Sequence, residues 1–338
     1  MDLRKTRILK SFTLSINDIL FSIQHDKLTI IKDDTVITTS IKQEELGMLE
    51  AFCIKAKDVV QPLPGNNVVY SIKGENQDVV LLRDGKDTYT LIINDQIQFI
   101  TDIDTIYHEA LVSPAVACLT DIKDVLILGG GDGLVAKQLF KELDNVNVTL
   151  VDFDKNITDI FTYDPVMREF NENSMDKCSV INDDAYTFVQ SCINMYDVII
   201  CDFPDPDDVI FNKLYSLEFY TNVKKLLKPN GAMSVQCGSI SKESKCFLSI
   251  KKTLEACGFK TKPYYSSCNF AELTFCLATL EGNPNPVFKN KYETLDQYFF
   301  DNAMTIFRPK VKFNSEVEIN TKENMAAYNY RKEELEWK

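Results

Sequence analysis

The feature that most constrains the fold is a repeated alternation of strand-like and helix-like segments that begins at residue 124. Short runs of apolar, often β-branched residues predict buried strands, and most are followed by a turn and a segment with helical spacing. The strands are predicted in the segments DVLILGGGDG (124–133), NVTLVDFD (147–154), SVINDDAYTFVQSC (179–192, which also begins a helix), YDVIICDF (196–203), AMSVQCGS (232–239) and AELTFCLATL (271–280). Because alternating strands and helices build parallel sheets, we predict an α/β fold with a Rossmann-like, doubly wound, mostly parallel sheet.

The chain ahead of this alternation is rich in strand-like segments. Residues 26–41 predict two strands joined by a short turn, and residues 68–103 predict a β-meander. The segment QPLPGNN (61–67) marks a boundary, because Pro and Gly interrupt regular structure. We therefore expect four parts. They are a small β-rich region of unknown role (1–65), an N-terminal β-meander domain (66–110), a Rossmann-like catalytic domain (111–280) and a C-terminal tail (281–338).

Composition indicates a globular protein without a membrane span. The 338 residues are 45% hydrophobic and 26% charged, and no stretch approaches the roughly 18 uninterrupted apolar residues of a membrane helix. The start of the chain has no clean apolar block and no small-residue cleavage site, so we expect no signal peptide. Ten cysteines without a C-x-x-C pair indicate reduced thiols in a cytoplasmic protein. With two histidines we expect no metal site, and the net charge of −13 argues against a nucleic-acid partner.

Carboxylates follow each of the first four strands of the predicted parallel sheet. The acids are Asp132, Asp152, Asp154, Asp183, Asp184, Asp202 and Asp205, and Gln236 ends the fifth strand. The carboxyl ends of parallel strands meet at one edge of a sheet, where such folds bind ligands. Converging carboxylates raise each other's pKa values, and a cation would relieve the repulsion. A divalent metal is one option, although acids on separate strands do not resemble a calcium loop. A cationic organic ligand is the other.

The turn Gly129–Gly133 lets the backbone approach a ligand. Such turns serve dinucleotides and S-adenosyl nucleosides alike, and a dinucleotide fingerprint can be fitted onto residues 131–136. Two features oppose a dinucleotide: Asp132 would repel a pyrophosphate, and no obvious basic residue lies near the turn. Asp152 is compatible with either ligand, because both carry ribose hydroxyls. A tight turn that binds nothing is the simpler alternative.

The segment YDVIICDFPDPDD (196–208) ends a buried strand with four carboxylates in seven residues. Aspartate and proline are turn residues, so an acidic turn without a ligand is one interpretation. Next to the acids of the other strand ends, the segment favours a cation-binding edge. We expect Asp202 and Asp205, which lie nearest the strand, to act on a ligand, and we expect Asp207 and Asp208 to be solvated turn residues.

Together these segments resemble the polyamine aminopropyltransferases, the spermidine and spermine synthase family. The resemblance covers residues 70 to 280, and the GGGDG turn, the Tyr-His-Glu of residues 107–109 and the Asp-x-x-Asp-Pro of residues 202–206 are specific in combination. The segments that carry it are NQDVV (76–80), DQIQF (95–99), YHEAL (107–111), LILGGGDGLVAKQL (126–139), VDFD (151–154), NDDAY (182–186), YDVIICDFPDPDD (196–208), LYSLEFY (214–220) and VQCGS (235–239). Residues 292–337 also resemble the tail of bacterial members that carry an added membrane domain.

The resemblance implies a fold like that of S-adenosylmethionine methyltransferases and a reaction between two cations. The family moves the aminopropyl group of decarboxylated S-adenosylmethionine to an amine and releases 5′-methylthioadenosine. The donor lacks the carboxylate of S-adenosylmethionine, which Asp132 would repel. Asp202 is implied as the catalytic residue that orients the attacking amine and receives its proton. The implied donor-binding residues are Gln77, His108, Gly129, Gly131, Asp132, Asp152, Asp184 and Ala185. The implied acceptor-binding residues are Gln98, Tyr107, Asp205, Gln236 and Glu272, and His108 also lines the acceptor channel.

The implied mechanism is an in-line displacement at the carbon next to the sulfonium. A carboxylate with a pKa near about 4 is a weak base for an ammonium with a pKa near about 10. We therefore expect Asp202 to act mainly by positioning the amine and stabilising the cation that forms. The resemblance further implies no cofactor besides the co-substrate, and a cytoplasmic homodimer without a membrane partner.

Departures from the family pattern fall on the acceptor side of the predicted site. Cys268, Ala271 and Leu273 stand where many members have Tyr, Gly and Trp, while Glu272 is retained. We expect putrescine as the acceptor and spermidine as the product, and spermidine as the acceptor, giving spermine or thermospermine, stays open.

Two functions of other classes also stay open. One is an S-adenosylmethionine-dependent methyltransferase on the same fold, which Asp132 opposes because methyltransferases must accept the donor's carboxylate. The other is a catalytically dead binder, which the intact pair of Asp202 and Asp205 opposes.

Overall fold

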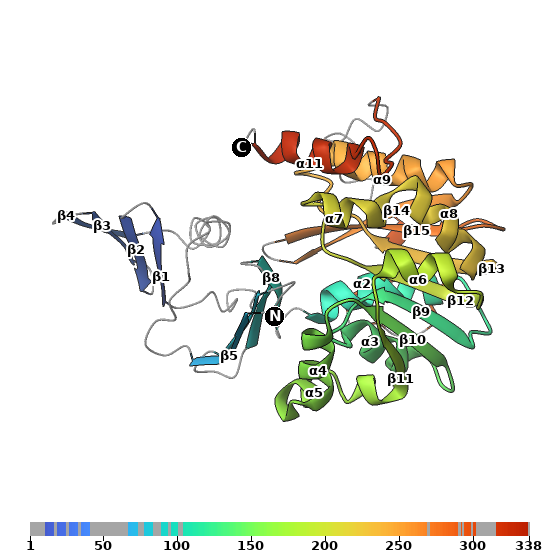
Figure 1. The fold of residues 1–338 in the computed structure, drawn as a ribbon, viewed down its shortest axis with the longest axis horizontal. Coiled ribbons are helices and arrows are strands. Elements are labelled where there is room, and N and C mark those ends of the chain that lie inside the picture. Colours follow the sequence, from blue (N-terminus) through green and yellow to red (C-terminus); the bar gives the residue numbers. More distant parts are fainter. Residues whose placement is uncertain are drawn as a thin grey trace. The chain divides into compact units, whose positions relative to one another are not determined.

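A computed structural model of the chain provides the structure. It describes residues 11–16, 19–24, 27–32, 35–40, 67–73, 78–83, 89–93, 96–100, 104–268, 271–289, 292, 294–298, 300–301 and 316–336. The chain divides into two compact units, Met1–Asp104 and Thr105–Lys338 (Figure 1).

The N-terminal unit contains two four-stranded antiparallel sheets. Each sheet keeps the order of its strands in the sequence, so each is a meander. The first holds β1 (Ser11–Ile16), β2 (Ile19–Gln24), β3 (Lys27–Lys32) and β4 (Thr35–Ser40). The second holds β5 (Asn67–Lys73), β6 (Asp78–Arg83), β7 (Tyr89–Ile93) and β8 (Gln96–Ile100). The strands predicted within residues 26–41 and the meander predicted over 68–103 are confirmed.

The C-terminal unit is built on a seven-stranded sheet with the order β11-β10-β9-β12-β13-β15-β14. Its strands are β9 (Asp124–Gly129), β10 (Asn147–Asp152), β11 (Cys178–Asn182), β12 (Tyr196–Asp202), β13 (Leu227–Gln236), β14 (Lys260–Cys268) and β15 (Ala271–Thr279). The first five strands are parallel, and β15 runs antiparallel to both β13 and β14. The prediction of a doubly wound, mostly parallel sheet is therefore confirmed.

Strand β14 was not predicted. It contains Pro263 and two lysines, residue types that are depleted in strands. Proline in particular has no backbone N–H to donate to the hydrogen-bond ladder of the sheet. The strand lies at the edge of the sheet, where proline is tolerated. Its place in the sheet is set by pairing with β15 along its whole length, from Lys260 opposite Thr279 to Cys268 opposite Ala271.

Helices cover the two faces of this sheet. The helices are α2 (Asp104–Val116), α3 (Leu134–Glu142), α4 (Lys155–Tyr163), α5 (Pro165–Phe170), α6 (Ala185–Ser191), α7 (Val209–Asn212), α8 (Leu217–Leu226), α9 (Ser244–Ala256) and α11 (Ala326–Glu336). Alternate residues of the central strands, among them Leu126, Cys201 and Val235, form one buried cluster with side chains of α6, α8 and α9. On β14, the hydroxyl of Tyr264 lies 2.9 Å from Ser234 Oγ of β13 and donates to the carbonyl of Ala110 in α2. Helix α2 therefore covers the opposite face of the sheet.

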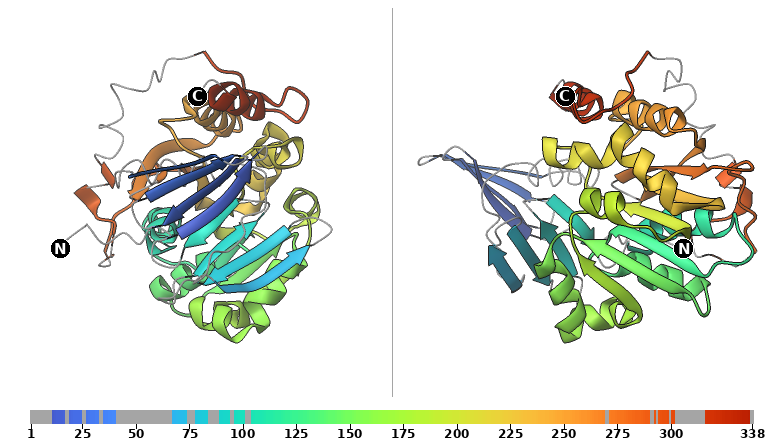
Figure 2. Two further views of the ribbon diagram at one scale, coloured as in Figure 1. Left: turned by 90° about the vertical axis from the view of Figure 1, so that its left-hand side faces the viewer. Right: turned by 45° about the vertical axis from the view of Figure 1, so that its right-hand side comes forward.

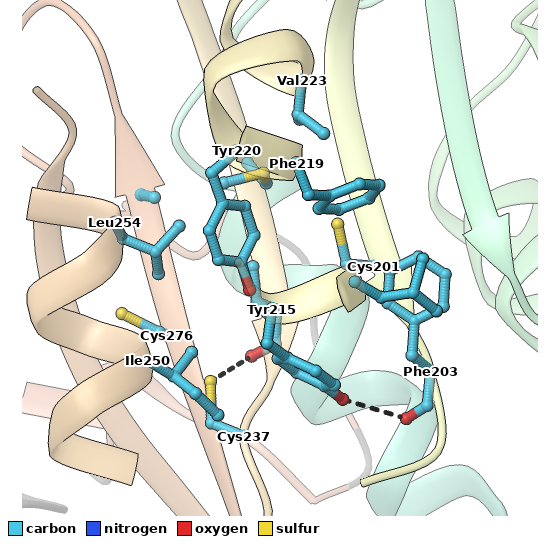
Figure 3. Packing of buried hydrophobic residues seen from close by; sticks show 14 of the residues in the cluster. Cys201, Phe203, Tyr215, Phe219, Tyr220, Val223, Cys237, Ile250, Leu254 and Cys276 are labelled. Atoms are coloured by element: carbon cyan, nitrogen blue, oxygen red, sulfur yellow. Dashed lines mark hydrogen bonds between the residues drawn. The ribbon is translucent and has the colours of Figure 1, made fainter. Parts of the chain in front are cut away.

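Helix α8 shows how the sequence produces this core. Its buried residues Phe219, Tyr220, Val223 and Leu226 recur at helical spacing and form one apolar face. Ser216 caps the helix by accepting a hydrogen bond from the backbone of Phe219, as preferred N-cap residues do. Figure 3 shows Phe219 and Tyr220 packed with Cys201 of β12 and with Tyr215. Burial of each such side chain contributes about 1.5–3 kcal/mol.

Part of the segment predicted as a tail is an ordered layer on α9. Helix α11 lies along α9 in Figure 1 and in both views of Figure 2. Asn320, which precedes α11, is fully buried, and its backbone N–H donates to the Thr253 hydroxyl of α9 over 2.7 Å. The Asn320 carbonyl accepts from the Leu217 N–H over 2.8 Å, so the segment joins α8 to α9.

Candidate active site

The two central strands, β9 and β12, meet at the point where the strand order reverses. From β9 the chain moves outward through β10 to β11, and it then crosses back to β12 on the other side of β9. Asp202 at the end of β12 lies in register with Gly129 at the end of β9. Doubly wound sheets bind ligands at such a switch point. The predicted glycine turn and the predicted catalytic aspartate are therefore neighbours.

Glycine is required in the turn after β9 because the neighbouring strand ends come very close. A Cβ atom on Gly129 would lie 2.0 Å from the carbonyl oxygen of Asp202, and the φ of Gly129 is +84°. A Cβ atom on Gly131 would lie 2.8 Å from the carboxyl group of Asp152. The glycines thus let the ends of β9, β10 and β12 converge.

The carboxylate of Asp152 at the end of β10 is held by backbone donors. Its Oδ2 accepts from the N–H of Gly131 over 3.0 Å, and its Oδ1 accepts from the N–H of Asp154 over 2.8 Å. Burial raises the pKa of Asp152 from 3.8 to about 6, against the lowering effect of these two hydrogen bonds. Repulsion by Asp132 and Asp154 adds to the rise as a smaller cause. The predicted mutual repulsion of the acids is present, but burial is the larger effect.

Two of the predicted donor-binding acids accept backbone hydrogen bonds at the start of a helix, and one of them, Asp184, is the N-cap of α6. Asp132 accepts from the N–H of Leu134 over 2.9 Å at the start of α3. Asp184 accepts from the N–H of Tyr186 over 2.9 Å at the start of α6, and it pairs with Lys213 over 2.5 Å. Ala185, the first residue of α6, is buried. Carboxylates at helix N-termini satisfy unpaired N–H groups, so these acids also stabilise the local fold.

The half-buried carboxylate of Asp202 lies beside Tyr107 of α2. The Tyr107 hydroxyl donates to Asp202 Oδ1 over 2.5 Å, and the rings of Tyr107 and His108 meet edge to face at 4.9 Å. Burial raises the pKa of Asp202, while the charge of His108 and the hydrogen bond from Tyr107 lower it. Burial, together with the negative charge of Asp202, raises the pKa of Tyr107 well above its usual value of 10.0, so Tyr107 stays a neutral donor.

Asp205 lies between two partners from different elements. The amide of Gln236 at the end of β13 donates to Asp205 Oδ1 over 2.8 Å. The Tyr215 hydroxyl contacts Gln236 Oε1 over 3.2 Å and the Pro204 carbonyl over 3.0 Å. It also lies 3.4 Å from the Phe203 carbonyl, as drawn in Figure 3. The predicted acceptor residues Tyr107, Asp205 and Gln236 therefore belong to the same edge of the sheet as Asp202.

The sequence interpretation missed Arg331. Its guanidinium group, from α11, pairs with Asp205 over 2.9 Å and also pairs with Asp207 and Glu243. The expectation that Asp207 is a solvated turn residue was therefore wrong. Asp208 is also more than a solvated acid, because it caps α7 by accepting from the N–H of Phe211. No local pattern in the sequence signals Arg331, since it reaches the site only through the packing of α11.

Three predicted site residues have side chains that lie outside the described part of the structure. Gln77 lies between β6 and the preceding strand, outside the described residues. Gln98 lies on β8, and Glu272 lies on β15 opposite Ser267. Their roles stay predictions.

The carboxylates at the ends of β10 and β12, those of Asp152 and Asp202, have no lysine or arginine partner among the described residues, although the charge of His108 acts on Asp202. The described part of the chain also contains no group of three His, Cys, Asp or Glu residues placed to bind a metal ion. The carboxylates of Asp152 and Asp202 suit an organic cation at this edge of the sheet.

No helix in the described ranges is both long enough and apolar enough to cross a bilayer.

Comparison with known proteins identifies the family. The spermine/spermidine synthase domain matches residues 104–289, which is more than half of the chain. Polyamine aminopropyltransferase 1 of Streptomyces coelicolor is 33% identical over 252 residues, which are 72% of this chain and 47% of that protein. The polyamine aminopropyltransferase of Shewanella oneidensis is 39% identical over 209 residues, which are 57% of this chain and 36% of that protein. The chain spans less than half the length of these curated relatives.

Solved structures share the fold. The spermidine synthase of Thermotoga maritima superposes with a TM-score of 0.59 at 20% identity, over 83% of this chain and 91% of that chain. A spermidine synthase in complex with the transition state analogue AdoDATO has the same TM-score at 19% identity. It covers 83% of this chain and 92% of that chain. With the domain match and the curated relatives, these findings show that the chain belongs to the spermine/spermidine synthase family.

Proposed function

We propose that the chain is an aminopropyltransferase that transfers the aminopropyl group of decarboxylated S-adenosylmethionine to putrescine. The products are spermidine and 5′-methylthioadenosine. The observation that carries this proposal is the half-buried carboxylate of Asp202, which lies beside the glycine turn, accepts from Tyr107 and forms no ion pair within the described residues. A half-buried carboxylate at the switch point attracts a cationic substrate and holds its reacting nitrogen.

The neighbouring strand ends support a nucleoside donor. The carboxylate of Asp152 would accept hydrogen bonds from the ribose hydroxyls, and its raised pKa would fall as it gained these donors. Asp132 would hold the aminopropyl ammonium and repel the carboxylate of ordinary S-adenosylmethionine. Asp184 and Ala185 at the start of α6 would contact the adenine. Gly129, Gly131, His108 and Gln77 would complete the donor site.

The chemistry is a displacement at carbon. The lone pair of the acceptor nitrogen attacks the carbon next to the sulfonium, the carbon–sulfur bond breaks, and its electrons neutralise the sulfur. The carboxylate of Asp202 positions this nitrogen and stabilises the ammonium that forms, which then releases its proton to Asp202. Because burial raises the pKa of Asp202, this carboxylate accepts a proton more readily than an exposed aspartate. Tyr107 holds the carboxylate in place. Gln236, Gln98 and Glu272 would bind the rest of the acceptor, and Asp205, whose charge is paired with Arg331, would border the far end of the channel.

Incubation of the purified protein with decarboxylated S-adenosylmethionine and single amines tests this function. The amines are putrescine, cadaverine, spermidine and spermine, and mass spectrometry reads the products. We expect methylthioadenosine with every productive acceptor and the highest rate with putrescine. No methylthioadenosine with any amine would contradict the proposal, and a higher rate with spermidine would replace spermidine synthesis by spermine or thermospermine synthesis.

The family resemblance also supports a homodimer in the cytoplasm that needs neither a metal nor a further cofactor. Sedimentation of the purified chain tests the oligomeric state. Turnover that is unchanged after extensive chelation tests the independence from a metal.

A further inference from the structure

The C-terminal helix α11 supplies a cation to the predicted acceptor site. Arg331 is 9% exposed, and its Nη2 lies 2.9 Å from Asp205 Oδ2. The same guanidinium pairs with Asp207 of the β12–α7 loop and with Glu243, which precedes α9. The Arg331 guanidinium therefore pairs with two carboxylates of the β12–α7 loop and with a third that precedes α9.

The guanidinium is carried by a firmly packed element. The Glu334 carboxylate of α11 accepts from the N–H groups of Lys245 and Cys246 in the first turn of α9, over 2.9 Å and 3.3 Å. At the other end of α11, the N–H of Ala327 donates to the buried side chain of Asn320 over 3.0 Å. The packing of α11 on α9 thus fixes the position of the Arg331 backbone, and the arginine is an ordered part of the folded unit.

Arg331 stands where a substrate cation would bind. Gln236 occupies Oδ1 of Asp205 and Arg331 occupies Oδ2. A protonated amine and a guanidinium compete for the same carboxylate, because both bind it by charge-assisted N–H···O contacts. An ammonium that reached Asp205 would also meet the positive charge of Arg331 at short range.

We propose that Arg331 determines acceptor specificity by occupying the anionic subsite of Asp205, Asp207 and Glu243. The arginine restricts the acceptor to a short diamine and excludes longer amines that carry a further ammonium. This inference rests on the proposed aminopropyl transfer and names the substrate class of that same site. The natural chain then discriminates against spermidine by like-charge repulsion.

Substitution of Arg331 tests the proposal through the ratio of kcat/KM for spermidine to kcat/KM for putrescine. We expect Arg331→Met and Arg331→Gln to raise this ratio by about 10-fold or more, because the vacated carboxylates bind the extra ammonium. We expect Arg331→Lys, which keeps the positive charge that repels an ammonium, to leave the ratio within about 3-fold of the natural chain. Glu334→Gln on the same helix is the matched control, because it weakens the contact of α11 with α9 without touching the three carboxylates.

A purely structural role of Arg331 makes a different prediction. It lowers the thermal stability of the Met and Gln variants and leaves the ratio unchanged, and this result would overturn the proposal. An equal rise of kcat/KM for all amines would also overturn it, because Arg331 would then block the site without selecting a substrate. The Gln variant keeps a polar side chain, so it provides the comparison where the Met variant fails to fold.

Equilibrium binding separates this proposal from the function on which it rests. If neither the natural chain nor the variants form methylthioadenosine with any amine, the proposed aminopropyl transfer is contradicted. Isothermal titration with spermidine still tests the subsite in that case. We expect the Gln variant to bind spermidine about 10-fold more tightly than the natural chain. Equal affinities would overturn the assignment of Arg331.

Discussion

At the scale of single residues, burial decides which acids can do chemistry. The strand ends of the sheet carry several aspartates, but their environments differ. Asp202 and Asp152 have pKa values raised by burial, whereas the charge of Asp205 is paired with Arg331 and that of Asp184 with Lys213. Asp202 and Asp152 thus combine a raised pKa with the absence of a lysine or arginine partner among the described residues. We assign proton transfer to the first and ribose binding to the second.

Removal of the Asp202 charge should abolish most turnover and keep the fold. We expect Asp202→Asn to lower kcat by about 10²–10⁴-fold, the usual contribution of a positioned acid or base. Asp208→Asn is the matched control, because asparagine caps a helix about as well as aspartate. Steady-state kinetics and circular dichroism of both variants check this. Near-normal turnover in Asp202→Asn would contradict the assigned role.

The hydrogen bond from Tyr107 should set the acid limb of the pH profile. Asp202 must be ionised to act, so kcat/KM falls as pH drops through its pKa, which burial raises above 3.8. The Tyr107 hydroxyl lowers this pKa, and its removal should therefore move the acid limb to higher pH. The measurement is kcat/KM against pH for the natural chain and Tyr107→Phe, with the exposed Tyr163→Phe as control. A limb that stays in place or moves to lower pH would count against this arrangement.

The half-buried carboxyl of Asp152 should make the free energy of unfolding depend measurably on pH. Its pKa of about 6 in the folded state lies above the ordinary 3.8, so the folded state holds a proton that the unfolded chain has released between these values. Stability from this group therefore falls as pH rises through that range. Relative to Asp152→Asn, we expect the natural chain to lose about 2 kcal/mol of unfolding free energy from about pH 4.5 to pH 7. Urea unfolding checks this, and the same measurement on Asp159→Asn, at an exposed ion pair, should show no such difference.

At the scale of elements, one helix supplies the N-terminal cap of another. Glu243, which precedes α9, makes no side-chain cap, and Glu334 of α11 accepts from the first-turn N–H groups instead. We expect Glu334→Ala to lower the free energy of unfolding by about 1–2 kcal/mol, as the loss of a cap does. Glu333→Ala removes an exposed ion pair with Lys245 and should cost about 0.5 kcal/mol or less. Denaturant unfolding of both variants compares them, and equal effects would show that Glu334 is not the cap.

Elements with a strong pattern were predictable and those set by tertiary packing were not. Apolar runs such as VLIL and VIIC predicted β9 and β12. Strand β14 carries proline and lysine, and it is a strand because β15 pairs with it. Helix α11 is mostly polar, and it becomes an ordered layer because α9 and the buried Asn320 hold it.

At the scale of the whole molecule, charge supports the proposed substrates. The chain carries a net charge of −13, and Asp202, which has no lysine or arginine partner among the described residues, lies at the switch point of the central sheet. A cationic amine should therefore be drawn to the protein, and salt should screen this attraction. We expect kcat/KM for putrescine to fall about 3-fold or more between roughly 20 mM and 200 mM salt, with little change in kcat. A kcat/KM that is constant or rises with salt would contradict this, and a neutral osmolyte at matched osmolality is the control.

The position of the site was predictable because the topology of parallel sheets brings strand ends together. Asp202 and Gly129 are 73 residues apart in the sequence, yet β9 and β12 place them in register. The partners of these acids could not be predicted in the same way. Arg331 and Lys213 reach the acids through the packing of helices, which no local pattern encodes.

A competition between two donors tests the central claim most directly. The purified chain is given equal amounts of decarboxylated S-adenosylmethionine and ordinary S-adenosylmethionine together with putrescine, and one mass spectrum reads all products. The acids at the sheet edge predict methylthioadenosine and spermidine, with the ordinary donor left intact. S-adenosylhomocysteine and a methylated product would contradict the account and would indicate a methyltransferase on the same fold.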